Sequence, residues 1–165
     1  MERRSFLKQA SVGIAVGAAA APALASELPT IKWRLASSFP KTLDAIFGAS
    51  ETVAKHVAAA TGGKFQISLF AAGEIVPSPG VLDAVKDGTV ECGHTASYYF
   101  IGKDPTFAFD TAIPFGLNSR QHSAWQLSGG GLELLREFFK DYNIYSIPCG
   151  NTGTQMGGWF RKEIK

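Results

Sequence analysis

Strand-like and helix-like segments alternate regularly through the first half of this chain, and this order restricts its fold more than any other feature. Apolar and polar residues alternate in the segments 31–37 and 64–70, with the period of a half-buried strand. A third strand-like segment covers residues 90–95, and a helical pattern lies between each pair of strands. Because β-α-β crossovers join parallel strands with one hand, we expect an α/β fold with a mostly parallel sheet flanked by helices.

The helix boundaries in this half carry ordinary start and stop signals. The first helix has Thr42 or Asp44 as a candidate N-cap, and the glycine pair 62–63 ends its apolar periodicity. The second helix is shorter, with Pro79 near its start and Gly88 at its end. These signals predict a long helix and a short helix as the two crossovers.

The second half of the chain is mostly helical in pattern. Residues 119–127 and 131–142 each carry one apolar face and are separated by glycines. Residues 143–150 then return to a strand-like pattern, which we expect to continue into the glycine-rich segment 150–165. We therefore expect a second group of helices followed by a returning strand.

The first residues of the chain resemble an export signal. Paired arginines at Arg3 and Arg4 precede a mildly apolar run that ends in the small-residue triplet 23–25, which is typical of a twin-arginine signal peptide. A membrane anchor is the alternative, but the run is interrupted by glycines and a proline and is shorter than a bilayer requires. We expect residues 1–25 to be removed and residues 26–165 to form one domain in the periplasm.

Charge and cysteine content narrow the classes of function. The chain has a formal net charge of +2 and no basic stripe, so nucleic acid is not an expected partner. Its two cysteines, Cys92 and Cys149, are expected to be a buried pair of free thiols, with a disulfide as the open alternative in an oxidising compartment.

The loops that leave the carboxyl ends of the strands form the expected binding crevice, because ligands of open parallel sheets bind there. Ser38 and Phe39 lie in the first loop, residues 71–79 form the second, and Tyr98 and Tyr99 lie in the third. The Ser38 hydroxyl precedes a helix, so it suits an anion or simply a helix cap. The tyrosines offer phenol donors on rigid apolar rings, although such residues also occur in cores. No G-x-G-x-x-G follows the first strand, which disfavours a dinucleotide.

Evidence for catalysis in the sequence is weak. His94 lies near Cys92 and the crevice, and a periplasmic enzyme using His94 with Cys92 is the alternative function. A histidine in this position is more often a hydrogen-bonded core residue. The chain contains no nucleophile elbow, HExxH, CxxC or P-loop motif. We therefore expect a binding protein rather than an enzyme.

Several segments, taken in order, resemble the solute-binding proteins of TRAP transporters. The similarity extends from about residue 31 to the end of the chain, and one motif is similar to the branch of the family that binds alpha-keto acids such as pyruvate. The segments are "LASSFPKTLDA", "AAATGGKFQISLFAAGEI", "LDAVKDGTVECGHTASYYFIGKDP" and "AIPFGL".

This resemblance implies a periplasmic protein that captures a small 2-oxo monocarboxylate and delivers it to the membrane subunits of a transporter. It implies that Gln155 faces the ligand and helps to coordinate a bound sodium ion, and that Tyr98 and Tyr99 line the pocket. No covalent cofactor is implied. The resemblance also allows a homodimer of the full-length protein.

One family feature has no counterpart in the sequence. Family members have an arginine that grips the substrate carboxylate slightly beyond the point reached here, and Arg161 comes too early for that role. We therefore expect residues 26–165 to be the N-terminal lobe of a periplasmic-binding-protein-like fold, with the second lobe missing. Such a lobe alone is expected to bind pyruvate poorly and to expose apolar surface.

Overall fold

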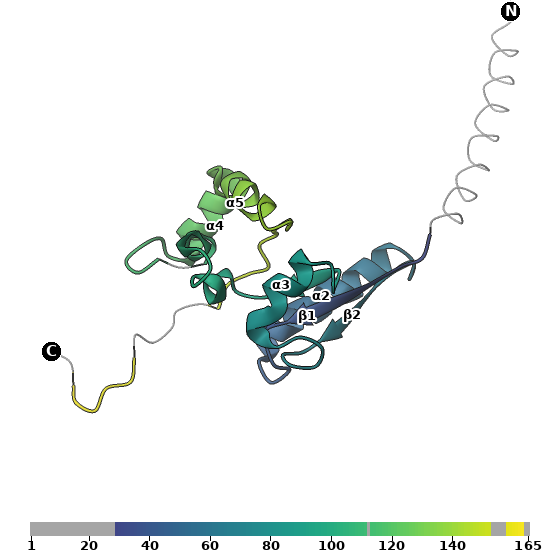
Figure 1. Ribbon diagram of the computed structural model, residues 1–165, viewed down its shortest axis with the longest axis horizontal. Coiled ribbons are helices and arrows are strands. Elements are labelled where there is room, and N and C mark those ends of the chain that lie inside the picture. Colours follow the sequence, from purple (N-terminus) through teal and green to yellow (C-terminus); the bar gives the residue numbers. More distant parts are fainter. Residues whose placement is uncertain (1–28, 112, 153–157, 164–165) are drawn as a thin grey trace, which may run out of the picture.

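A computed structural model shows an α/β fold in which one parallel sheet is followed by a group of helices (Figure 1). It describes residues 29–111, 113–152 and 158–163. The strands are β1 (Ile31–Ser37), β2 (Phe65–Phe70) and β3 (Cys92–His94). The α-helices are α2 (Asp44–Ala60), α3 (Val81–Lys86), α4 (Ser119–Ser128) and α5 (Gly131–Lys140). Three short 3-10 helices are η1 (Ser78–Gly80), η2 (Ser97–Phe100) and η3 (Pro105–Asp110).

The sheet confirms the predicted order and direction of the strands. β1 lies in the centre and pairs in parallel with both β2 and β3, so the order is β2-β1-β3. Ile31 pairs with Phe65, whereas Ser37 pairs with His94, so β3 meets only the carboxyl end of β1. The first four residues of β1 are exposed and its last three are buried, so burial in the central strand increases toward its carboxyl end.

The two crossover helices cover opposite faces of the sheet. Ser50 of α2 contacts His94 at one face, whereas Gly93, the neighbouring residue on β3, lies against Val81 and Val85 of α3. Successive residues of a strand point to opposite faces, so α2 and α3 must lie on different sides. This arrangement buries a small core between α3 and the sheet that includes Ala36 and Val90.

α3 also joins the sheet to the helical half of the molecule. While Val81 and Ala84 face the sheet, Leu82 packs into a second core between η2, η3 and α5. Phe107, at the centre of this second core, is fully buried. Its ring lies 4.9 Å from that of Phe138 and 5.6 Å from that of Phe139. The two cores are therefore connected through one short helix.

Helix ends differ in how they are stabilised. α4 begins with a capping box, in which the Asn118 side chain accepts from the backbone N–H of Gln121 and the Gln121 side chain accepts from that of Asn118. The prediction that Thr42 or Asp44 caps α2 is wrong, because Leu43 is the N-cap and offers no side-chain acceptor. Asp44 instead lies in the first turn, where its negative charge interacts favourably with the helix dipole.

The prediction of a returning strand is also wrong for the described part of the segment. Residues 144–152 pair with none of the described strands. The segment is held by α5 instead: Arg136 Nε donates to the carbonyl oxygen of Ser146 at 3.2 Å, and its guanidinium lies over the Tyr145 ring. A strand needs a neighbour to receive its backbone hydrogen bonds, and the described sheet does not extend to this segment.

Many apolar side chains of the helical half remain exposed, as expected from the sequence. Examples are Leu127, Ile147 and Trp159, which are 70%, 72% and 89% exposed. No helix within the described ranges is long and apolar enough to cross a membrane. Residues 1–25, for which we predicted a signal peptide, lie outside the described residues.

Candidate ligand-binding crevice

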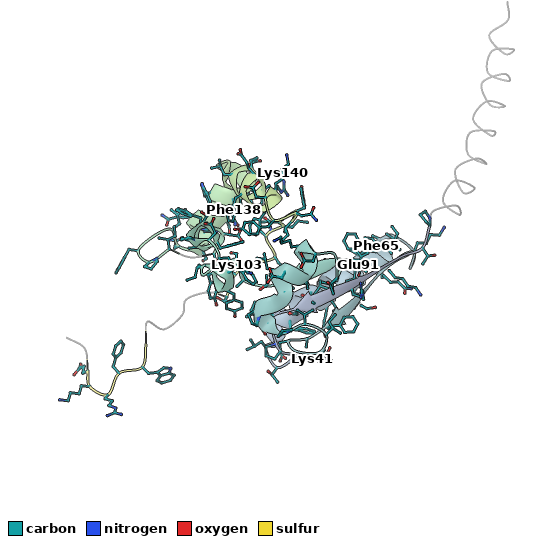
Figure 2. All side chains as sticks on the ribbon, in the orientation of Figure 1. Lys41, Phe65, Glu91, Lys103, Phe138 and Lys140 are labelled. Atoms are coloured by element: carbon teal, nitrogen blue, oxygen red, sulfur yellow. The ribbon has the colours of Figure 1, made fainter. Side chains whose placement is uncertain are left out.

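The three loops at the carboxyl end of the sheet meet as predicted. Figure 2 shows Lys41, which follows β1, at the opposite end of the sheet from Phe65, which begins β2. The Ser38 hydroxyl lies 3.0 Å from the carbonyl oxygen of Ser78 and 2.7 Å from the Thr95 hydroxyl. Because a carbonyl can only accept, Ser38 donates to Ser78 and Thr95 can donate to Ser38. One residue from each loop thus enters a single hydrogen-bonded group.

This hydrogen-bonded group determines what Ser38 can do. Ser38 is 5% exposed, and its backbone carbonyl accepts a second bond from the Ser78 hydroxyl at 2.9 Å. α2 begins only at Asp44, so the Ser38 hydroxyl does not cap it. In the described structure Ser38 joins the loops, and its hydroxyl is occupied by protein partners.

A second set of contacts fixes the first loop to the second. Lys41 Nζ and the Glu74 carboxylate form an ion pair of 2.7 Å, and the other Glu74 oxygen accepts from the backbone N–H of Ala71 at 2.9 Å. The N–H of Ala72 also donates to the carbonyl oxygen of Phe39. The hydrogen bond from Lys41, together with that from Ala71, lowers the pKa of Glu74, so the carboxylate stays charged at neutral pH.

Aromatic rings form one wall of the crevice. The Tyr98 and Tyr99 rings meet edge to face at 4.6 Å, and the Phe39 ring lies 6.2 Å from that of Tyr99. Phe39 is buried, whereas Tyr98 and Tyr99 are 40% and 41% exposed. A hollow of about 260 Å³ opens beside Tyr99 and is lined also by Ser78 and Pro79. The structure therefore brings four predicted residues, Ser38, Phe39, Tyr98 and Tyr99, to one end of the sheet.

A larger hollow, of about 320 Å³, lies elsewhere, between η3 and α4. Its lining is mostly apolar and includes Phe109, Leu117 and Trp125. Its polar side chain, His122, has Nε2 within 3.0 Å of the carbonyl oxygen of Asp110. The crevice beside Tyr99 is the better candidate despite its smaller volume, because it lies at the carboxyl end of the parallel sheet, where open α/β folds bind their ligands.

His94 and Cys92 both lie at this end of the sheet, but their environments oppose nucleophilic catalysis. Burial raises the pKa of the Cys92 thiol to about 11, and its sulfur lies 3.7 Å from the carbonyl oxygen of Arg34. Burial lowers the pKa of His94, whose Nδ1 is 2.6 Å from the Ser50 hydroxyl. At neutral pH the thiol is protonated and unreactive, and the imidazole is neutral and engaged with a helix.

The two cysteines are free in the structure, and Cys149 is exposed. The expectation of two free thiols therefore agrees with the structure, whereas the expectation of a buried pair is wrong, because Cys92 is only half-buried and Cys149 is exposed. Cys149 lies in the segment 143–150 that we predicted as a strand. Because this segment does not join the described sheet, the thiol stays exposed.

Gln155, the predicted ligand and ion residue, lies outside the described residues. Among the residues that are described, no three histidine, cysteine, aspartate or glutamate side chains are grouped so that they could hold a metal ion. The described crevice thus supplies hydroxyl and phenol groups, but no set of strong metal ligands.

Residues 36–165 match the family model described as bacterial extracellular solute-binding protein, family 7. The chain belongs to this family. A monocarboxylate 2-oxoacid-binding periplasmic protein of Nostoc is 50% identical over 171 residues, a match that covers all of this chain and 47% of the relative. The resemblance to TRAP solute-binding proteins inferred from the sequence is confirmed by solved structures as well.

Two solved structures of TRAP solute-binding proteins are similar in fold and sequence. One, from Bordetella bronchiseptica, is 54% identical with a TM-score of 0.80, and the match covers 84% of this chain and 41% of the relative. That structure is a mixed-occupancy dimer, with copurified calcium and picolinate in one active site and an apo site for comparison. The other, from Pseudoalteromonas atlantica, has bound sodium and pyruvate and is 44% identical with a TM-score of 0.76. The match covers 82% of this chain and 41% of that relative. This family 7 chain spans less than half the length of these relatives.

Proposed function

We propose that this chain forms the first lobe of a TRAP-transporter solute-binding protein that captures a small 2-oxo monocarboxylate such as pyruvate. The observation that carries the proposal is the 50% identity, over the whole chain, to the 2-oxoacid-binding protein of Nostoc. The sodium and pyruvate in the Pseudoalteromonas structure support the same class of ligand. By this proposal, the captured acid is handed to the membrane subunits of the transporter.

Each residue of the proposed site has a distinct role. Tyr98 and Tyr99 donate phenol hydrogen bonds to oxygens of the acid, and Phe39 provides an apolar surface against its carbon atoms. Ser38 acts mainly by joining the three loops. Gln155 contributes a side-chain amide to the acid and to the ion. Lys41 follows β1 at this edge and is paired with Glu74, so in this proposal charge balance for the carboxylate comes from other residues.

The ion is the part of the proposal that the described residues support least. Sodium and calcium prefer several oxygen ligands, and the described residues do not gather carboxylates that could supply them. In this proposal Gln155 supplies one oxygen, and the bound acid and other parts of a complete protein supply the rest. The calcium and sodium of the two relatives give the precedent.

We further propose that residues 1–25 direct export by the twin-arginine route and are removed, which leaves residues 26–165 as the lobe. The names of the family and of the Nostoc relative indicate a periplasmic solute-binding protein. A homodimer of the complete protein is consistent with the dimer described for the Bordetella relative.

The enzyme alternative receives no support. The names of the family and the relatives describe binding proteins. The raised pKa of Cys92 also argues against a thiolate nucleophile in the crevice.

The test is calorimetric titration of pyruvate into this chain and into a fusion of it to the part of the Nostoc relative that lies beyond the match. We expect saturable binding by the fusion and much weaker binding by the chain alone, because a ligand held between two lobes loses contacts and gains water when one lobe is absent. Tyr99→Phe removes one phenol donor and should weaken the affinity of the fusion for pyruvate about 2- to 13-fold, the equivalent of one neutral hydrogen bond.

Tyr145→Phe is the matched control, because Tyr145 is exposed and lies against Arg136 away from the crevice. Its affinity should equal that of the unchanged fusion. Heat with a sugar or an amino acid, but with no 2-oxo acid, would exclude the proposed ligand class. Equal pyruvate affinity in the chain alone and in the fusion would exclude the one-lobe interpretation.

A further inference from the structure

His94 lies directly behind the aromatic wall of the crevice. It is the last residue of β3, pairs with Ser37 of β1, and its carbonyl oxygen accepts from the N–H of Ser38 at 2.8 Å. Its backbone is therefore fixed by the sheet at the point where the first crevice loop begins. Its side chain points to the face of the sheet that α2 covers, where Ser50 meets it.

The orientation of the His94 ring is set by α2. The Ser50 hydroxyl, on a residue only 3% exposed, lies 2.6 Å from His94 Nδ1. A hydrogen bond at one ring nitrogen restricts rotation of an imidazole, in the same way that outer partners orient histidines in metal sites. Burial also lowers the pKa of His94, which keeps the ring uncharged beside its apolar neighbours.

The His94 ring in turn contacts Phe39. The two ring centroids are 5.0 Å apart with an interplanar angle of 61°, an edge-to-face contact. The Phe39 backbone is held separately: its N–H donates to the Ser37 hydroxyl at 3.1 Å, and its carbonyl oxygen accepts from Ala72. The ring of Phe39, which the backbone bonds do not orient, is thus in contact with His94 and Tyr99.

We propose that His94 is a positioning residue that orients the Phe39 ring, and through it Tyr99, in the wall of the ligand crevice. The inference rests on the proposed function for its biological meaning, but the ring contacts can be tested without any ligand. It assigns separate tasks to the two parts of the side chain. Nδ1 fixes the ring on Ser50, and the ring surface supports Phe39.

These two tasks can be separated by substitution. His94→Phe keeps an aromatic ring beside Phe39 but loses the bond to Ser50. His94→Gln keeps a polar partner for Ser50 but loses the ring, and His94→Ala loses both. His122→Gln is the matched control: the His122 ring is also hydrogen-bonded, here to the carbonyl oxygen of Asp110, and lies 5.5 Å from the Trp125 ring, but it is not part of the crevice.

The first measurement uses the chain itself and follows the nuclear Overhauser contact between the Phe39 and Tyr99 rings. We expect this contact in the unchanged chain, in His94→Phe and in His122→Gln, and its loss in His94→Ala and His94→Gln while the amide spectrum stays dispersed. If the contact persists in His94→Ala, or disappears equally in His122→Gln, the proposal is overturned. If the His94 variants fail to fold, Ser50→Ala decides instead: Phe39 resonances should shift more than those of Phe107, and equal shifts overturn the proposal.

The second measurement is 2-oxo acid affinity in the two-lobed fusion. We expect His94→Ala to weaken binding about two- to tenfold, the range of one aromatic pair, and His94→Phe to stay within about twofold of the unchanged fusion. Unchanged affinity in His94→Ala would overturn the inference for the site. If the ring contact depends on His94 but no form binds a 2-oxo acid, the proposed function fails and the positioning role of His94 remains.

Discussion

The close approach of α3 to the sheet depends on the absence of a side chain at Gly93. A Cβ built at this residue would lie 2.7 Å from Val81 Cγ1 and 3.0 Å from Val85 Cγ2. Carbon atoms pack comfortably at about 3.5 to 4.0 Å, so Gly93→Ala forces a displacement of roughly 1 Å at Val81. Val81 is fully buried, so it can move only by displacing its neighbours in the core. We therefore expect Gly93→Ala to destabilise the chain by about 1 to 3 kcal/mol, the usual cost of overpacking.

Urea and thermal unfolding measure this change directly. For a domain of this size, about 1 kcal/mol corresponds to roughly 4 °C in melting temperature. The control is Gly48→Ala, because Gly48 lies within α2 and an added Cβ would meet nothing within 4 Å. In that position alanine should stabilise the helix by up to about 1 kcal/mol.

A double variant makes the steric explanation specific. Val81→Ala removes the methyl group that the new Cβ would strike, so Gly93→Ala combined with Val81→Ala should cost less than the sum of the two single changes. Neighbouring residues typically couple by about 0.5 to 3 kcal/mol. If Gly93→Ala leaves stability unchanged, or if the two changes are simply additive, the close approach of α3 is not what requires glycine.

Two further predictions concern the pH dependence of stability. The hydrogen bonds and ion pair with Arg34 lower the pKa of Glu91 from 4.5 to about 2. The contribution of Glu91 to the free energy of unfolding is therefore fully present above about pH 4.5 and is lost as the pH falls toward 2. Urea unfolding should show that Glu91→Gln loses less stability than the unchanged chain in this acid range. Burial raises the pKa of Asp110 despite hydrogen bonds from Ser97 and Gln126, so the contribution of Asp110 to stability falls as the pH rises through its pKa in the folded chain. Asp110→Asn should therefore gain stability relative to the unchanged chain on going from acid to neutral pH. The same stability difference between the two chains at acid and at neutral pH would contradict this prediction.

The sequence predicted the sheet well because its signals are local. Alternation identified β1 and β2, and apolar periodicity ending at paired glycines identified α2. The direction of the strands then followed from the crossover rule. The returning strand failed for the opposite reason: the pattern of residues 144–150 is strand-like, but a strand is completed only by a neighbour, and the described residues provide none.

The position of the candidate crevice could be predicted from the sequence, but its internal contacts could not. Knowing that parallel sheets bind ligands at their carboxyl ends placed Ser38, Phe39 and the two tyrosines together. The network that occupies the Ser38 hydroxyl was missed, because Ser78 and Thr95 come from separate loops and only the folded chain brings them into contact. The role of Ser50 was missed for the same reason, since nothing in the sequence links a helix serine to a histidine at the end of β3.

The central place of β1 has a consequence for how the chain folds. β1 is the first strand to be synthesised, yet both of its partners lie beyond a complete crossover, and Arg34 reaches Glu91 across a separation of 57 residues. Closing such long loops costs entropy before any ladder bond is gained, whereas α2 can form from local contacts. The sheet therefore has no local nucleus: β1 can pair with β2 only after residue 70 has been made, and its other edge stays unpaired until residues 92–94 follow.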